Sequence, residues 1–315
     1  MNRTLIAGSV ALALAGCGGS SFNEVFEDTS TGTISIAITD APVDNVTEVW
    51  VEFSGVTLKP QGGDEIEIAF SSPKSFDLLT LQNGVTAVLQ EPTTVPAGPY
   101  SWVRLGVNAE LGVRDSYAIQ DGMEVELRIP SGSERGLQLS GGLTVTANQS
   151  SSFVVDWDLR KALVDPVGQP GVLLLRPSLR ISDQTRSGTL TGTVDAALLD
   201  ANATGCANDL AADTGNAVYL FDGPNSDVDD INDSDTDPVV TANVTQDQDG
   251  DYVYSVSYLE VGDYTAAFTC TASNDDPAED DNADDAVDPF EFAAVVNDIS
   301  IAEGETTVVD FTAAQ

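Results

Sequence analysis

The residues of this chain best suited to chemistry are its carboxylates, and one pair has a suggestive spacing. Asp156 and Asp158 stand two apart in an apolar run, so on a β-strand their side chains share a face at roughly 6 to 7 Å. Two carboxyl groups so placed can flank a glycosidic bond, and a carbohydrate-active enzyme is therefore one hypothesis. The same alternation puts Arg160 on their face. An ion-paired face exposed to solvent is the simpler interpretation, and we favour it.

Two loops rich in aspartate suggest a second kind of chemistry, the binding of a cation. They cover residues 227–237 and 275–285. Calcium takes roughly six to eight oxygen ligands, which carboxylates can supply. The candidate calcium ligands are Asp227, Asp229, Asp233, Asp235 and Asp237. Pro238 follows where an EF-hand needs glycine and a distal glutamate, so that motif fails. Hydrated loops that bind no ion are the competing interpretation, and the one we favour.

The absence of histidine from the sequence excludes several catalytic classes. Nucleophiles activated by histidine and zinc sites that use imidazole both need this residue. A serine–lysine pair would have to use Lys59, Lys74 or Lys161, and no motif places a serine with any of them. The sequence also contains no P-loop and no dinucleotide-binding fingerprint. We therefore expect a protein that is not an enzyme and that needs no cofactor, with calcium as the one candidate ligand.

Charge divides the sequence into two unequal parts. All 12 lysines and arginines lie at or before Arg186, whereas 29 of the 51 aspartates and glutamates lie beyond it. Residues 187–315 therefore carry a formal charge of −29. A segment of this charge repels phosphate backbones and anionic membrane surfaces, because either would need lysine or arginine at the contact. The sequence thus argues against a nucleic-acid partner.

The amino terminus resembles a bacterial lipoprotein signal. A positive start, Met1–Arg3, precedes an apolar run from Leu5 to Ala15, which has the length of a signal-peptide core rather than of a membrane span. Small residues then lead to Cys17. The resemblance implies that residues 1–16 are removed and that Cys17 carries diacylglycerol and an N-acyl group such as palmitate. A cysteine lost by cleavage at another site is the alternative.

The residues after Cys17 favour lipidation and indicate a destination. Residues 17–30 begin with Gly18-Gly19-Ser20-Ser21, which is typical of a flexible tether. Several acyl chains together make membrane anchoring stable where one would be marginal. In bacteria resembling the enteric ones, aspartate after the anchor retains lipoproteins in the inner membrane. Gly18 at this position therefore predicts the outer membrane, with the face that the protein occupies left open.

The two remaining cysteines, Cys206 and Cys270, are expected to form one disulfide, because exported proteins tend to pair such residues. Closing a loop of about 65 residues stabilises a fold by roughly 4 kcal/mol in the chain-entropy model. Two free thiols or a redox pair form the alternative. We favour the structural role because no lysine, arginine or histidine lies nearby to stabilise a thiolate.

Alternating apolar residues predict β-strands over most of the chain. Ile34, Ile36 and Ile38 alternate with smaller or polar residues, which is typical of a strand with one buried face. Further strands are expected at residues 49–53, 65–68, 102–107, 123–129, 192–194, 218–221, 252–259 and 264–268, with a hairpin at Asp249-Gly250. Residues 76–81 and 159–164 show weak helical spacing. The predicted fold class is all-β: two β-sandwich domains, Greek-key or prealbumin-like, with at most short helices.

Four segments of the first part resemble domain of unknown function 4382 (DUF4382). They are Thr39-Asp40-Ala41-Pro42, Val95-Pro96-Ala97-Gly98-Pro99-Tyr100, Phe153-Val154-Val155-Asp156-Trp157-Asp158-Leu159-Arg160 and Leu175-Arg176-Pro177-Ser178-Leu179-Arg180. The resemblance covers residues 31–182. It implies an exported bacterial protein, often a lipoprotein, and no established activity. Residues 183–188 are the expected linker, and residues 189–315 the expected second domain.

The second domain is expected to be an acidic sandwich. Residues 259–268 are similar to a corner of prealbumin-like or carboxypeptidase-regulatory-like sandwiches, and Gly98-Pro99-Tyr100 echoes this corner in the first domain. There, glycine can adopt a conformation closed to other residues, and tyrosine can pack while it reaches a polar partner.

Together these features predict a lipid-anchored, non-enzymatic envelope protein that presents two β domains for binding or as a spacer. Its partners would be the membrane, through the lipid, and an unknown envelope protein or glycan. A calcium-dependent adhesion module and a carbohydrate-active enzyme are the alternatives.

Overall fold

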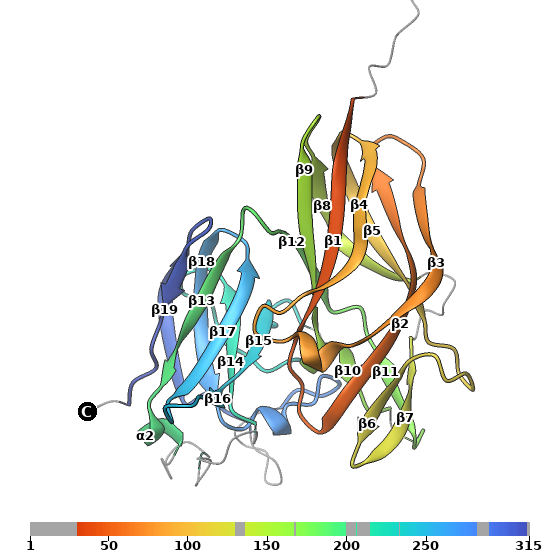
Figure 1. Cartoon of the computed structure of the whole chain (residues 1–315). Helices are drawn as coiled ribbons and strands as arrows, with labels where there is room; N and C mark the ends of the chain where they lie inside the picture. The colour runs from red at the N-terminus through yellow and green to blue at the C-terminus, as the bar shows by residue number, and fades with distance from the viewer. Residues whose placement is uncertain are drawn as a thin grey trace, which may run out of the picture.

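The computed structural model describes residues 30–129, 136–166, 168–199, 206, 215–232, 234–281 and 290–313. Within them the fold is all-β, as the sequence predicted: four sheets form two β-sandwiches that lie side by side (Figure 1). We call residues 31–183 the amino-terminal half and residues 188–313 the carboxy-terminal half. Cys17 and the proposed signal segment lie outside the described residues.

The amino-terminal half pairs a four-stranded sheet with an eight-stranded one. The first sheet has the order β12-β9-β1-β4, and β1 pairs with β9 in parallel. Its strands are β1 (Thr31–Ala41), β4 (Ala87–Pro96), β9 (Ser150–Asp158) and β12 (Leu179–Asp183). The second sheet has the order β10-β11-β7-β6-β2-β5-β8, and β3 also pairs with β2. Its strands are β2 (Val46–Pro60), β3 (Ile66–Asp77), β5 (Gly98–Asn108), β6 (Tyr117–Gln120), β7 (Met123–Arg128), β8 (Leu137–Val145), β10 (Leu163–Val164) and β11 (Val172–Leu175).

The core of this half follows from the period of two. Ile34, Ile36 and Ile38 on β1 are fully buried, and the residues between them are less so. Phe53 on β2 meets them from the second sheet and packs edge-on against Trp157 of β9, with 6.3 Å between ring centroids. Burying a side chain of this size contributes about 1.5 to 3 kcal/mol, so the alternation itself holds the two sheets together.

The carboxy-terminal half pairs two four-stranded sheets, β16-β17-β13-β20 and β15-β14-β18-β19. The strands are β13 (Gly188–Val194), β14 (Ala217–Asp222), β15 (Val240–Asn243), β16 (Thr245–Gln246), β17 (Tyr252–Leu259), β18 (Gly262–Thr269), β19 (Ala294–Ile301) and β20 (Thr306–Val308). Gly250, at a φ of 92°, lies in the turn between β16 and β17, where the sequence predicts a hairpin. The structure joins Cys206 and Cys270 in a disulfide that links the segment before β14 to the end of β18.

The helices in the described residues are short, as expected. Two are α-helical, α1 (Leu159–Ala162) and α2 (Ala196–Leu199), and two are 3-10 turns, η1 (Leu78–Leu81) and η2 (Ala272–Asn274). The first 3-10 turn and α1 fall where the sequence shows helical spacing. In the part of the chain described, no helix has both the length and the apolar character needed to cross a membrane.

The two predicted corners, at Tyr100 and Tyr264, each contain the same kind of hydrogen bond. The hydroxyl of Tyr100 donates to the carbonyl oxygen of Pro96 at 2.7 Å, and that of Tyr264 donates to the carbonyl oxygen of Glu260 at 2.9 Å. Each tyrosine is buried and reaches back four residues. Gly98, at a φ of 135°, takes the left-handed conformation expected of the first corner. The same expectation is wrong for Gly262 of the second corner, which has no positive φ.

Candidate functional site at the junction of the two halves

The candidate pair Asp156 and Asp158 lies at the junction between the two halves. Both side chains leave β9 on the face opposite Trp157, as the alternation predicted, but they are only 5% and 4% exposed. The prediction that this face of the strand is exposed to solvent is therefore wrong. From Phe153 to Asp158, β9 is buried on both faces. The sandwich core covers the face of Trp157, and the carboxy-terminal half contacts the face of Asp158.

Asp158 is held by donors from both halves. Its Oδ2 accepts from the backbone N–H of Thr241 at 2.8 Å, and its Oδ1 accepts from the Thr241 hydroxyl at 3.2 Å. Oδ1 also caps α1 by accepting from the N–H of Lys161 at 3.4 Å. Burial raises the pKa of Asp158, and nearby Asp156 adds to this effect, while Lys161 and Arg160 oppose it. Both oxygens are thus engaged in structure.

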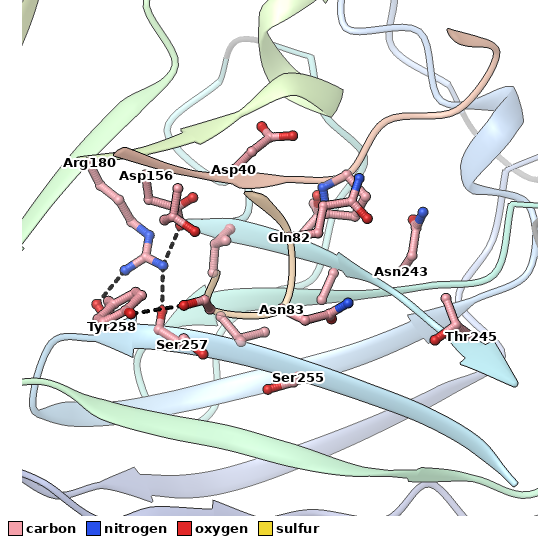
Figure 2. A pocket seen from close by; sticks show the side chains of 17 residues that line it. Asp40, Gln82, Asn83, Asp156, Arg180, Asn243, Thr245, Ser255, Ser257 and Tyr258 are labelled. Carbon is pink, nitrogen blue, oxygen red and sulfur yellow. Dashed lines mark hydrogen bonds and ion pairs between the residues drawn. The ribbon is translucent and has the colours of Figure 1, made fainter. Parts of the chain in front are cut away.

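Asp156 pairs with Arg180 rather than with Arg160. The Nη2 of Arg180 lies 2.5 Å from Oδ2 of Asp156 and also donates to the carbonyl of Ser257 at 2.9 Å, while Nη1 donates to the carbonyl of Tyr258 at 2.7 Å (Figure 2). The Tyr258 hydroxyl in turn donates to the carbonyl of Gly84 at 3.0 Å. Asp156, Arg180, Ser257 and Tyr258 line one side of a cavity of about 30 Å³, which has room for about one water molecule.

Arg160 lies in α1, not on the strand, because β9 ends at Asp158. It is 3% exposed and forms an ion pair with Asp44 of its own half. Across the junction it donates to Asn243 Oδ1 at 2.7 Å and to the carbonyl of Ala272 at 3.2 Å, and its guanidinium stands 5.9 Å from the centroid of the Tyr219 ring. Burial lowers the pKa of Arg160 and Asp44 raises it, so that on balance it lies above the usual value.

Two further cations complete the junction. The ammonium of Lys161 donates to the carbonyl of Pro238 at 2.5 Å and lies 3.6 Å from a carboxylate oxygen of Asp237. The guanidinium of Arg176 donates to the carbonyl of Pro277 at 2.9 Å. The charged segments at residues 156–161 and 176–180 therefore meet several separate loops and strand ends of the carboxy-terminal half.

This geometry fits a structural role better than acid–base catalysis. A groove of about 210 Å³ reaches Asp156 and Asp158, with Lys161 and Arg180 beside them. Ligand pockets usually measure about 300 to 1,000 Å³, so the groove is small for a sugar substrate. The carboxylates there already accept hydrogen bonds or pair with a guanidinium, whereas a hydrolase must offer its carboxyl groups to substrate and water.

The five candidate calcium ligands do not converge on one point among the described residues. Asp227 and Asp235 are exposed, and Asp233 lies outside the described residues. Asp237 accepts from the backbone N–H groups of Asn232 and Ser234 at 3.1 and 3.2 Å and faces Lys161, while Asp229 accepts from the hydroxyl of Thr236 at 2.9 Å. These two carboxylates shape their own loop.

Three other carboxylates meet where the two acidic loops touch. Oxygens of Asp230, Asp275 and Asp281 lie within 4.8 Å of one another and could hold a cation. The Tyr219 hydroxyl donates to Asp275 at 2.6 Å, and the N–H of Asp281 donates to Asp230 at 2.8 Å. Burial raises the pKa of Asp275 to about 7 and that of Asp230 to about 6. We call these three residues the carboxylate cluster.

Sequence reasoning missed this cluster and the role of the junction. Asp230 and Asp275 stand in the two acidic loops, but nothing in the sequence places those loops side by side. Arg176 and Arg180 belong to a segment that carries the family resemblance. This resemblance was the only feature of the sequence that singled them out.

The comparisons with known proteins agree with the resemblance seen in the sequence. Residues 31–177 match a family model, the domain of unknown function DUF4382. The matched residues include Asp156, Asp158, Arg160, Lys161 and Arg176, so the last part of the matched region forms one side of the junction. No curated protein matches the chain in sequence.

Solved structures with some likeness to the chain include a fimbrial protein and a minor pilin. A fimbrial protein from Bacteroides ovatus is 8% identical at a TM-score of 0.22, over 90% of this chain and 49% of that one. The minor pilin GBS52 from Streptococcus agalactiae is 12% identical at a TM-score of 0.18, over 88% of this chain and 94% of that one.

Proposed function

We propose that this protein is a non-enzymatic, lipid-anchored component of the bacterial envelope. Cys17 would carry the lipid, residues 17–30 would form the tether, and two β domains would stand at the outer membrane as a binding or spacer element. An envelope protein or a glycan would be the partner. The proposed domains are residues 31–182 and the prealbumin-like residues 189–315, joined by residues 183–188.

One observation carries the non-enzymatic part of the proposal. The residues with the best spacing for catalysis, Asp156 and Asp158, are buried and engaged by Arg180 and Thr241. The sequence has no histidine to act in their place. The chemistry-bearing side chains therefore serve to hold the protein together.

The anchoring part rests on the sequence and is tested with the complete chain. Cells producing the wild type or Cys17→Ser are labelled with palmitate and separated into membrane and soluble fractions. The wild type should incorporate label and sediment with the outer membrane, and Cys17→Ser should lose both properties. Gly18→Asp is the matched variant, which should keep the label but move to the inner membrane. An unlabelled wild-type protein released into the medium contradicts anchoring.

The enzyme alternative has its own test. Purified protein is incubated with envelope glycans, and an Asp156→Asn variant is compared with the wild type. No hydrolysis by either protein is the expected result. Hydrolysis that disappears in Asp156→Asn would replace the proposal with a carbohydrate-active enzyme.

Calcium-dependent adhesion is the second candidate, and the carboxylate cluster is the observation that favours it. Calorimetric titration of the full chain with calcium chloride tests this function. Heat of binding that is lost in Asp230→Asn supports it. An absence of heat at millimolar calcium, with no change in the melting temperature, removes it.

A further inference from the structure

The junction joins surfaces of different charge character. The carboxy-terminal half has no lysine or arginine, because the last of the 12 is Arg186. The cations that cross the junction donate to backbone carbonyls of Pro238, Ser257, Tyr258, Ala272 and Pro277. We propose that the charged end of the amino-terminal half is a docking surface for the acidic carboxy-terminal half, and that docking fixes the two as one rigid arm.

The contacts are spread over the junction rather than gathered at one hinge. On the amino-terminal side they come from Gly84, the end of β9, α1, Arg176 and Arg180. On the carboxy-terminal side they reach β15, the end of β17, residues 237–238 and residues 272–277. Figure 1 shows β15 lying against the end of β1, between the two sandwiches. Contacts at separate points oppose rotation as well as separation.

The amino-terminal half orients its own donors before docking. Asp44 holds the guanidinium of Arg160, and Asp156 holds that of Arg180, both within this half. Long side chains that are already fixed lose less conformational entropy when they bind. The docking surface is therefore preformed, and its geometry selects one orientation of the partner.

The connection between the halves leaves little freedom. β12 ends at Asp183 and β13 begins at Gly188. Within this turn the Asp183 carboxylate accepts from the N–H of Thr185 at 2.9 Å, and the N–H of Arg186 donates to the carbonyl of Asp183 at 3.0 Å. The N–H of Gln184 donates to the carbonyl of Ser152 on β9 at 2.9 Å. A short turn with these hydrogen bonds differs from a flexible linker.

This inference is independent of the proposed function, because it concerns neither the lipid nor the ligand. A flexible pair of domains would adopt many relative orientations, whereas a rigid arm keeps the two halves in one orientation. The two arrangements differ in how often the junction opens, and hydrogen exchange measures that directly.

The test follows the exchange of the Thr241 amide, which donates to Asp158 across the junction. The full chain is compared with Arg160→Ala and with Arg114→Ala. Arg114 is a matched control, since it is exposed and pairs with Glu124 rather than with a residue of the junction. Arg160→Ala should speed exchange at Thr241 by about tenfold or more, because it leaves Asp44 and the acceptors across the junction without their cation. Arg114→Ala should leave the exchange rate unchanged.

A second variant protects the test against misfolding. Tyr258→Phe removes only the hydroxyl that bonds to Gly84, at a different point of the junction from Thr241. If docking is rigid, Thr241 should exchange about fivefold faster in this variant, as expected for the loss of one hydrogen bond. Wild-type Thr241 exchanging at the rate of a free amide would overturn the proposal. Folded Arg160→Ala and Tyr258→Phe proteins that both exchange at the Arg114→Ala rate would also overturn it.

Discussion

Replacing Asp275 by asparagine should change stability with opposite signs at high and low pH. In the folded protein, burial raises the pKa of Asp275 to about 7 from an ordinary 3.8, against the opposing effects of the Tyr219 hydroxyl, the Ile231 N–H and Arg160. The folded state therefore binds a proton more tightly than the unfolded state. Stability from this group is fully present below pH 3.8 and is lost as the pH rises through about 7.

The size of this change in stability follows from the pKa shift of Asp275. A difference of about 3 pKa units at about 1.4 kcal/mol each makes the ionised Asp275 cost about 4 kcal/mol at pH 8. Asparagine stays neutral, but its amide nitrogen replaces one of the two oxygens to which the Ile231 N–H donates, so that Tyr219 and Ile231 must share the remaining oxygen, which costs about 1 kcal/mol. Asp275→Asn should thus be more stable than the wild type by about 3 kcal/mol at pH 8. At pH 4 the unfolded carboxyl of the wild type is already about half ionised, so the variant should be less stable by about 0.5 kcal/mol.

Urea unfolding at both pH values measures these differences. A chelator is present throughout, so that no divalent cation neutralises the carboxylate cluster. Asp263→Asn serves as the control, because Asp263 is exposed and should show a small difference at either pH. A difference between Asp275→Asn and the wild type that is the same at pH 4 and pH 8 would refute the reasoning.

Three further predictions concern the amino-terminal core, the disulfide and the second corner. Phe53→Ala should lower the free energy of unfolding by about 3 to 5 kcal/mol, because a fully buried ring leaves a cavity; a loss below about 1 kcal/mol in urea unfolding would contradict the packing. Replacing both Cys206 and Cys270 by serine should cost roughly 4 kcal/mol for the 64-residue separation, and a reductant should then have no further effect on the melting temperature. Tyr264→Phe should cost about 1 kcal/mol through the lost bond to Glu260, and equal stability to the wild type would argue against the corner contact.

The sequence was a good guide to what depends on local alternation. The strands around Ile34, Val51 and Tyr254 could be predicted because β-structure buries every second residue when one face meets a core. The shared face of Asp156 and Asp158 followed from the same rule.

The burial of that face could not be predicted, because it depends on a second half that begins some 30 residues later. Arg160 left the predicted face for a similar reason: Asp158 caps a helix, and the strand alternation ends there. Composition and residue spacing do not predict tertiary contacts. The ion pair of Asp156 with Arg180 and the proximity of Asp230 to Asp275 are two such contacts.

A double-mutant cycle between Arg160 and Asn243 tests most directly whether the charged residues join the two halves. The free energy of unfolding is measured for the wild type, Arg160→Ala, Asn243→Ala and the double variant. The 2.7 Å contact between the guanidinium and the amide oxygen predicts a coupling of about 1.5 to 3 kcal/mol, the range for hydrogen bonds to charged groups. A coupling of zero, with all four proteins folded, would contradict the account.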